Sequence, residues 1–169
     1  GLSSSYIPCA ATIATADVAS AFEGEGNFFS MTLTFGGHPV AAAAALKNIE
    51  IIEREGLVQN SAEVGAYFLE LLRSIKEEHP IVGNVRGLGL MLSIELVGDP
   101  ETKAGFPAEL RVGPRLKAKF HQQGLILGPA GNYVNMAPPL CITRDEVDEI
   151  VAGVDAALRE LEDELVDEL

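Results

Sequence analysis

Residues 32–39 read TLTFGGHP and lead directly into an alanine-rich run, residues 40–55. Proline is tolerated at the first turn of a helix, where the N–H group that it lacks would have no partner, so Pro39 predicts that a helix begins here. The Thr34 hydroxyl, the Gly36-Gly37 pair and the N-terminus of this helix are then close together. Such donors suit an anion such as phosphate, but a glycine turn that only starts a helix has the same pattern.

The next 40 or so residues predict one more helix and two strands. Apolar residues at helical spacing predict a helix over residues 57–79, which Pro80 ends. Residues 82–86 and 90–97 predict strands around a glycine bend, and the second alternates strictly. Its two faces are Leu90, Leu92, Ile94 and Leu96 on one side, and Met91, Ser93, Glu95 and Val97 on the other.

The C-terminal part predicts two helices and two further strands. A helix over residues 112–123 ends at Gly124, and short strands at 125–127 and 133–136 flank a turn. Thr143 and Glu146 have the spacing of a capping box and begin the last helix. We expect its acidic end, Glu160–Glu168, to face solvent. We therefore predict a division into residues 1–79 and 80–169, the second part having the order β-β-α-β-β-α.

Composition excludes several classes of function. The 169 residues carry a formal net charge of −13, and this field repels phosphate backbones, so we expect no nucleic-acid partner. No apolar run reaches membrane-spanning length, and no cluster has metal-ligand spacing, so we expect neither a membrane nor a metal partner. Cys9 and Cys141 are expected to be buried, reduced thiols of a cytoplasmic protein.

Three segments, in order, resemble the class III aminotransferases, which are enzymes that depend on pyridoxal 5′-phosphate. The segment TFGGHP at residues 34–39 is similar to the family's Thr-Tyr-Gly-Gly-His-Pro. Residues 85–91, VRGLGLM, with IEL at 94–96, resemble its Arg-Gly-x-Gly-Leu-Met…Ile-Glu-Leu signature. Residues 137–143, APPLCIT, resemble its Ala-Pro-Pro-Leu-x-Ile-Thr.

The resemblance implies an α/β protein of fold type I. Residues 1–79 would be the C-terminal part of the large cofactor-binding domain with connecting helices, and residues 80–169 the small α+β domain. Gly1-Leu2-Ser3 matches the residues just after the family's Schiff-base lysine. The catalytic lysine would then precede this chain, which would contain no catalytic residue and would need the remainder of the same polypeptide.

The resemblance also implies the cofactor and the oligomer. Thr34 would bind the phosphate of a pyridoxal phosphate held mainly by the neighbouring subunit of a homodimer. The reaction would move an amino group from an amine or ω-amino acid to an oxo acid such as pyruvate.

One departure from the family bears on the substrate. Many members have an arginine two residues before Ala-Pro-Pro, where this chain has Asn135, and others have one in the loop that begins here at Gly128. An amide cannot neutralise a carboxylate as a guanidinium does. We therefore predict Asn135 and Gly128 as substrate-binding positions suited to donors without an α-carboxylate. The guanidinium of Arg86, beside two glycines, is a candidate contact for an anion. The alternative is that Arg86 forms a structural hydrogen bond.

Two other interpretations remain open from the sequence. A relative on the same scaffold could be an aminomutase, racemase or decarboxylase. A non-catalytic dimerisation module derived from the fold would share the same motifs.

Overall fold

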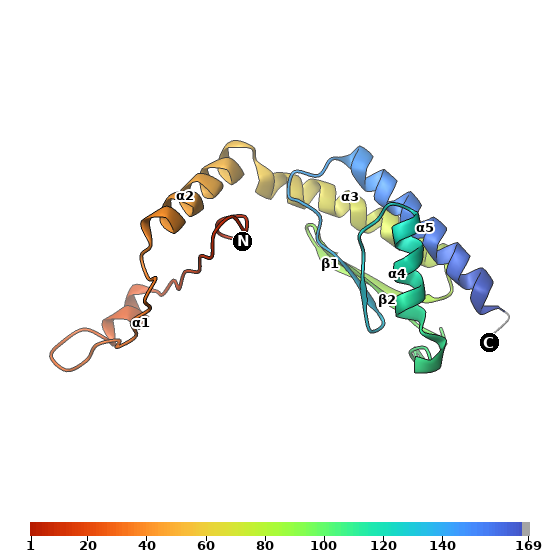
Figure 1. Ribbon diagram of the computed structural model, residues 1–169, viewed down its shortest axis with the longest axis horizontal. Helices are drawn as coiled ribbons and strands as arrows, with labels where there is room; N and C mark the ends of the chain where they lie inside the picture. The colour runs from red at the N-terminus through yellow and green to blue at the C-terminus, as the bar shows by residue number, and fades with distance from the viewer. Residues whose placement is uncertain (167–169) are drawn as a thin grey trace. The chain divides into compact units, whose positions relative to one another are not determined.

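The computed structural model describes residues 1–166, and the chain divides into two compact units, Gly1–Gly56 (unit 1) and Leu57–Leu169 (unit 2). Figure 1 colours the chain from its N-terminus to its C-terminus. The helix from Leu57 thus belongs to unit 2, whereas the domain division between residues 79 and 80 stays a prediction. This helix packs against the strands that follow it.

Unit 1 is mostly loop with two helices, α1 (Ala16–Ser20) and α2 (Pro39–Arg54). Thr15 caps α1, since its hydroxyl accepts a hydrogen bond from the Val18 N–H at 3.4 Å. The predicted helix after Pro39 is confirmed, and Gly56 follows its end with a φ of +62°.

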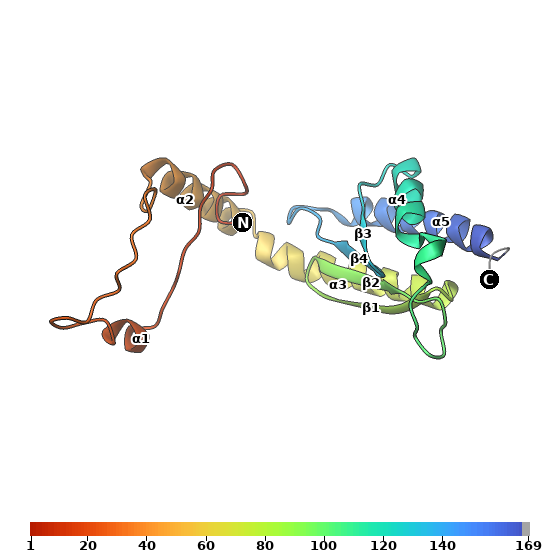
Figure 2. The same cartoon turned by 60° about the horizontal axis from the view of Figure 1, so that its bottom comes forward.

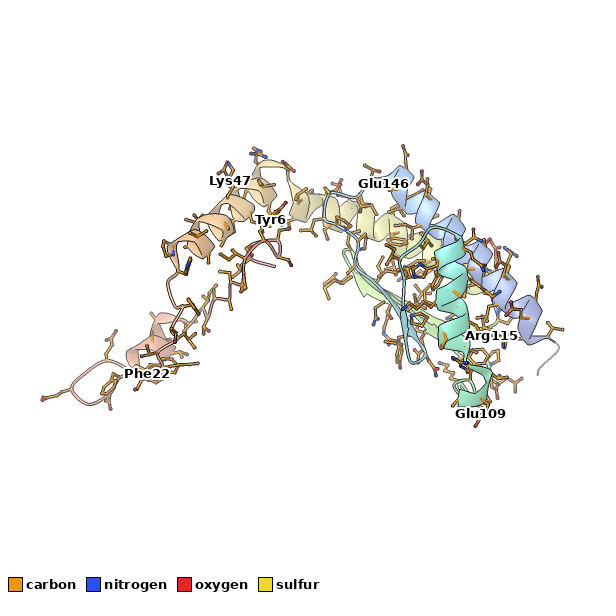
Figure 3. All side chains as sticks on the ribbon, viewed as in Figure 1. Tyr6, Phe22, Lys47, Glu109, Arg115 and Glu146 are labelled. Atoms are coloured by element: carbon orange, nitrogen blue, oxygen red, sulfur yellow. The ribbon has the colours of Figure 1, made fainter. Side chains whose placement is uncertain are left out.

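The apolar side chains of unit 1 are largely exposed. Within residues 1–56 the buried residues are Ser3 and Ala41, whereas Tyr6 is 90% exposed and Phe35 80% exposed. Figure 3 shows Tyr6 and Phe22 on this part of the chain. Burial of apolar side chains is the main favourable term in folding. Unit 1 therefore lacks a hydrophobic core of its own.

Unit 2 combines three helices with one antiparallel sheet. Its elements are α3 (Leu57–Glu78), β1 (Val82–Leu88), β2 (Met91–Leu96), a 3-10 turn (Ala108–Leu110), α4 (Val112–Gln122), β3 (Pro129–Ala130), β4 (Tyr133–Met136) and α5 (Arg144–Leu165). The strands lie in the order β1-β2-β4-β3. Figure 2 labels the four strands of this sheet together with α3, α4 and α5.

The core of unit 2 lies between the helices and one face of the sheet. The predicted inward face of β2 is confirmed, because Leu90, Leu92, Ile94 and Leu96 are each at most 3% exposed. These side chains pack with Phe68 and Leu72 of α3, Leu116 and Phe120 of α4, and Val154, Leu158 and Leu161 of α5. Val97 was assigned to the other face, but it is buried, since it lies against Gly83 just past the end of β2.

The opposite side of the sheet is not covered by helices of unit 2. Its residues alternate with the core residues along the strands. We call this the open face: Asn84, Arg86 and Leu88 on β1; Met91, Ser93 and Glu95 on β2; and Tyr133 and Asn135 on β4.

The two helix-end signals of the C-terminal half are confirmed. Gly124 has a φ of +77°, its N–H donates to the His121 carbonyl, and the Leu125 N–H donates to the Phe120 carbonyl at 2.8 Å. Thr143 and Glu146 form a full capping box, in which each side chain accepts from the other residue's N–H.

One local prediction is wrong, and another is confirmed only in part, since Asp163 and Glu164 of the acidic end of α5 are exposed. Residues 125–127 are not a strand, because the Leu125 N–H is used to close α4; Pro129–Ala130 pairs with β4 instead. Proline is acceptable in this edge strand, because no neighbouring strand needs the backbone N–H group that proline lacks. The acidic end of α5 is not simply solvated either: Glu160, Glu162 and Glu164 bind groups on other elements. Residues 167–169 of that predicted face lie outside the described part of the chain.

Candidate functional site

Unit 1 places Thr34 at the entrance of a turn that leads into α2. The turn is closed by a hydrogen bond from the Gly36 N–H to the Leu33 carbonyl at 2.9 Å. Gly37 has a φ of +68°, a left-handed conformation that glycine adopts without strain. The chain can therefore reverse here and enter α2 within a few residues.

A cavity of about 680 Å³ lies at this turn. It is lined by Pro8, Cys9 and Ala10, by residues 33–38, and by Ala41 and Ala42 of α2. The first intrahelical bond that the structure gives to α2 runs from the Ala42 N–H to the His38 carbonyl. The N–H groups of the preceding first turn have no intrahelical partner. The structure thus brings together the predicted hydroxyl, glycines and helix N-terminus.

The donors of this cavity fit a phosphate group. The Thr34 hydroxyl and backbone N–H groups are neutral donors, and a helix N-terminus carries about half a positive charge. The lining contains no Lys or Arg side chain. An anion held by these residues alone would be bound through hydrogen bonds and the helix dipole.

Unit 2 brings Asn135 and Gly128 to adjacent strands. Pro129 pairs with Val134, so Gly128 and Asn135 are the next residues along the two strands, both exposed. The loop between β4 and α5 is held to α3, because the Asn60 side-chain amide donates to the carbonyls of Leu140 (2.7 Å) and Ile142 (3.0 Å).

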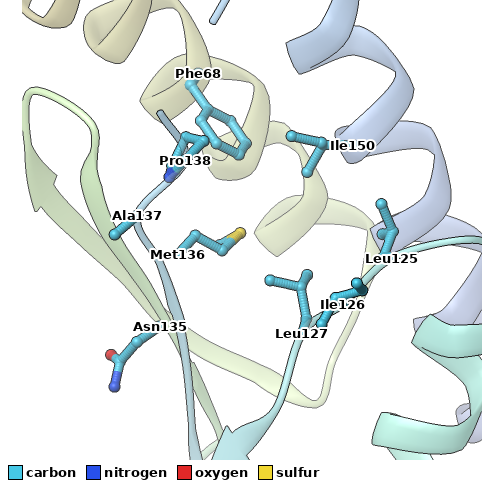
Figure 4. A pocket seen from close by; sticks show the side chains of 9 residues that line it. All are labelled: Phe68, Leu125, Ile126, Leu127, Asn135, Met136, Ala137, Pro138 and Ile150. Atoms are coloured by element: carbon cyan, nitrogen blue, oxygen red, sulfur yellow. The ribbon is translucent and has the colours of Figure 1, made fainter. Parts of the chain in front are cut away.

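Next to β4 lies an apolar cavity of about 280 Å³. Its lining is Phe68, Leu125, Ile126, Leu127, Asn135, Met136, Ala137, Pro138 and Ile150. Figure 4 shows the Asn135 side chain on the opposite side of β4 from the Met136 side chain, which lies among the apolar residues. The Asn135 amide therefore belongs to the open face of the sheet.

A cluster of three side chains crosses this open face. Arg86 donates from Nη1 to Glu95 Oε2 at 2.9 Å, and its guanidinium lies 5.2 Å from the centre of the Tyr133 ring. The Tyr133 hydroxyl donates to the other oxygen of Glu95 at 3.3 Å. The hydrogen bond to Glu95 raises the pKa of Arg86 above its ordinary value, with a further contribution from Tyr133. Arg86 thus has a structural partner and remains about half exposed.

A second polar cluster, around His79, has no signal in the sequence. His79 is fully buried, with Nδ1 2.7 Å from Glu162 Oε2 and Nε2 3.0 Å from Asp155 Oδ1. Arg159 and His79 lower the pKa of Asp155 through hydrogen bonds, with Arg159 contributing more. The cluster joins the end of α3 to α5, which is a structural role.

Both thiols are free; Cys9 is half-buried, and Cys141 is exposed rather than buried as predicted. Within residues 1–166, no group of three or more His, Cys, Asp or Glu side chains could hold a metal ion. In the same part of the chain, no helix has the length and apolar character needed to cross a membrane.

Known aminotransferases are similar to this chain in sequence and in structure. The family model of the class III aminotransferases matches residues 1–158. Diaminobutyrate–2-oxoglutarate transaminase of Halomonas elongata is 41% identical over 99% of this chain, and taurine–pyruvate aminotransferase of Bilophila wadsworthia is 37% identical over 96%. The crystal structure of an amine transaminase from an uncultivated Pseudomonas species, in its PLP-bound form, is 36% identical over 95% of the chain, with a TM-score of 0.91.

The chain spans only part of these proteins, namely 37% of the Halomonas enzyme, 38% of the Bilophila enzyme and 37% of the Pseudomonas structure. The expected fold type I is confirmed, since the solved neighbours are PLP-dependent transaminases. The chain therefore belongs to the class III aminotransferase family.

Proposed function

We propose that this chain is the C-terminal part of a transaminase that moves an amino group from an amine or ω-amino acid to an oxo acid such as pyruvate. The observation that carries the proposal is the cavity of unit 1, where Thr34, Gly37 and the N-terminus of α2 meet in a sequence with the family's motif. Relatives whose names include taurine–pyruvate and diaminobutyrate–2-oxoglutarate transfer support the reaction class.

The cofactor of this proposal is pyridoxal 5′-phosphate. When bound, it supplies an electron sink that stabilises negative charge on the carbon next to the reacting nitrogen. The role of this chain is to hold its phosphate: the Thr34 hydroxyl and the N–H groups at the start of α2 donate to the phosphate oxygens. A lysine upstream of Gly1 would attach the cofactor covalently and would move the proton that the transfer of the amino group requires.

Dimerisation belongs to the same proposal. Thr34 would serve the cofactor of the neighbouring subunit of a homodimer, as the family resemblance implies. The exposed apolar residues of unit 1, which include Phe28, Phe29 and Phe35, support this, because extended apolar surface marks an interface. We also propose a cytoplasmic location, in keeping with two free thiols.

Donor choice follows from Asn135 and Gly128. A desolvated carboxylate requires a paired cation, and neither residue supplies one. A diamine or arylalkyl amine needs no such partner. We therefore infer that donors without an α-carboxylate are preferred.

The test is amino-group transfer by the full-length polypeptide loaded with pyridoxal phosphate. With pyruvate and an arylalkyl amine, we expect alanine and the ketone of the amine to form in equal amounts. Release of carbon dioxide, racemisation of the substrate or migration of its amino group without alanine would support the alternative enzyme classes. No turnover by a folded, cofactor-loaded protein would favour the non-catalytic module.

A further inference from the structure

We propose that Asn48 of α2 is a positioning residue for the Schiff-base lysine of the proposed transaminase. The inference rests on the proposed function, in which that lysine directly precedes Gly1. Asn48 acts through the backbone of Gly1 and Leu2, and its side chain lies outside the lining of the cavity at Thr34.

The contact joins two segments that are far apart in the sequence. The side-chain amide of Asn48 donates to the Gly1 carbonyl at 3.1 Å and to the Leu2 carbonyl at 3.0 Å, across 47 and 46 positions. An amide NH2 group has two N–H donors, so these two hydrogen bonds use both. Because peptide groups are planar, the contact fixes two consecutive peptide planes to α2 and, with them, the direction in which the chain enters Gly1.

The backbone that follows Gly1 is a tight turn. Ser4 and Ser5 have φ values of +51° and +63°, a left-handed conformation that residues other than glycine rarely adopt. The Ser4 N–H donates to the Gly1 carbonyl at 3.2 Å, and Ser3 is only 4% exposed. Backbone in such a conformation persists only where the surrounding contacts hold it. The Gly1 carbonyl thus accepts from both the turn and Asn48.

A Schiff-base lysine depends on a fixed backbone more than most residues do. Its side chain is a flexible four-carbon stem, so the place of its nitrogen is defined only when the main chain is held. Proton transfer requires the two heavy atoms to lie about 2.6–3.2 Å apart, and a misplacement of about 1 Å can lower a rate by about 100-fold. A contact at the two residues after the lysine is therefore well placed to control its chemistry.

Helix α2 supports both parts of the proposed site. Its N-terminus lies at the cavity that contains Thr34, and Asn48 lies nine residues after Pro39, which is about 14 Å along the helix at 1.5 Å per residue. Under the proposed function, Thr34 serves the cofactor of the neighbouring subunit. The contact from Asn48 then links the lysine of one subunit to the phosphate site of the other through a single helix.

Asn48 is not needed to form α2. Asparagine is a poorer helix former than alanine, which occupies all of positions 41–45 of the same helix. Asn48→Ala is therefore not expected to weaken α2 itself, and its effect reports the lost contact with Gly1 and Leu2.

The test compares the affinities of the full-length protein, freed of cofactor, for pyridoxal phosphate and pyridoxamine phosphate. Both carry the phosphate, but only the aldehyde of pyridoxal phosphate condenses with a lysine amine, with loss of one water. We expect Asn48→Ala to weaken binding of pyridoxal phosphate by about tenfold, as for loss of two neutral hydrogen bonds, and that of pyridoxamine phosphate by less than about twofold. Thr34→Ala, which removes a donor to the phosphate, should weaken both.

Two further variants separate the hydrogen bonds from the space that the side chain fills. Asn48→Asp keeps the size of the side chain but has no N–H donor, so it should lose at least as much affinity for pyridoxal phosphate as Asn48→Ala. Asn48→Gln keeps the amide on a longer stem and should recover part of the loss. Glu53→Ala is the matched control, because it truncates an exposed side chain of the same helix.

Turnover of the holoenzyme gives a second readout. With an arylalkyl amine and pyruvate, Asn48→Ala should lower kcat by about tenfold and change KM for the amine by less than about twofold, because the proton transfer is affected and substrate binding is not.

Equal losses for the two cofactor forms would mean that Asn48 only supports the fold of unit 1, and unchanged affinities would mean that it does not position the lysine. Wild-type affinity in Asn48→Asp would show that the N–H donors are not used. Each of these results overturns the inference. If the wild type itself forms no covalent bond with pyridoxal phosphate, the proposed function has failed and the inference with it, and the wild type alone shows this.

Discussion

Gly65 of α3 lies directly against Gly89, in the turn between β1 and β2: a Cβ atom on Gly65 would stand 2.2 Å from the carbonyl carbon and oxygen of Gly89. Gly89 has a φ of +55°, and next to it the Leu90 N–H donates to the Ser61 hydroxyl of α3 at 3.3 Å. Gly89 of the VRGLGLM segment is thus required by close packing of the hairpin on α3.

Gly65→Ala is therefore expected to destabilise the protein strongly. The clash is with backbone atoms, which cannot rotate away, so we expect a loss of about 3 kcal/mol in the free energy of unfolding. Urea denaturation measures it. Gly153→Ala on α5 is the control: its Cβ would meet the Cδ1 of Leu125 at 2.8 Å, and that methyl group can move. Equal losses for the two variants would contradict this account.

His79→Ala should also be strongly destabilising. It removes the His79 partner of Glu162 Oε2, a carboxylate that is mostly buried, whereas Asp155 keeps its hydrogen bonds from Arg159 to Oδ1 (2.9 Å) and Oδ2 (3.0 Å). Breaking such a pair costs about 3–5 kcal/mol, and partial exposure of Glu162 places the expected loss at the low end. Thermal unfolding of the variant is compared with that of His121→Ala, whose exposed side chain lies in the last turn of α4. A similarly small loss of thermal stability in the two variants would show that the buried cluster does not stabilise the fold.

Acid stability should depend on Glu164. Hydrogen bonds from Lys119, and to a lesser extent Arg115, lower the pKa of Glu164 below its ordinary value of 4.5. A lowered folded-state pKa means that the stabilisation is full above pH 4.5 and is lost as the pH falls through the folded-state value. Unfolding free energies measured between pH 7 and pH 3 should therefore fall less steeply for Glu164→Gln than for the wild type. Glu101→Gln, in an exposed loop, should keep the wild-type slope.

Thr34→Ala should weaken cofactor retention. Removal of one hydroxyl from a charged acceptor costs about 1–3 kcal/mol. The dissociation constant of pyridoxal phosphate from the full-length protein measures this, and Thr34→Ser should restore most of the affinity. Thr32→Ala serves as the control, because Thr32 does not line the cavity. Unchanged affinity after Thr34→Ala would remove the residue from the phosphate site.

Asn135→Arg should shift donor preference toward α-amino acids. The new guanidinium would add a cation to the open face of the sheet, on β4 opposite Ser93. We expect the ratio of kcat/KM for an α-amino acid to that for a carboxylate-free amine to rise by about tenfold, or about 1.4 kcal/mol in the barrier. Asn84→Arg adds the same charge to the same face, opposite Glu95, and should leave the ratio near its wild-type value. No shift at Asn135 would mean that this position does not contact the substrate.

Local signals predicted most elements of this fold. The alternation from Leu90 to Leu96 gave the strand and its buried face, and the Thr143–Glu146 spacing gave the start of α5. Both are carried by residues a few positions apart, where side-chain periodicity and hydrogen bonding act directly. The turn at Thr34 and the helix after Pro39 were predictable for the same reason.

Long-range partners could not be read from the sequence. Three apolar residues at 125–127 fit a strand or a buried loop equally well, and only the ladder at Pro129 decides between them. His79 and Glu162 are 83 positions apart, and nothing in either segment marks the pairing. The cluster of Arg86, Glu95 and Tyr133 also emerges only once these residues are placed on three paired strands.

Unit 1 has almost no hydrophobic core, so substitutions of apolar residues should have different consequences in unit 1 and in unit 2. In unit 2, a change at Phe68 or Leu158 is opposed by neighbours in the same segment, because both side chains are almost fully buried there. In unit 1, Phe28 and Phe29 are 72% and 66% exposed. Within unit 1, Phe29 keeps an edge-to-face contact with Phe22, with 5.6 Å between the ring centres. Most of the surface of Phe28 and Phe29 is left for groups that meet unit 1 from outside, so substitutions there should act mainly on association and little on the packing of the unit itself.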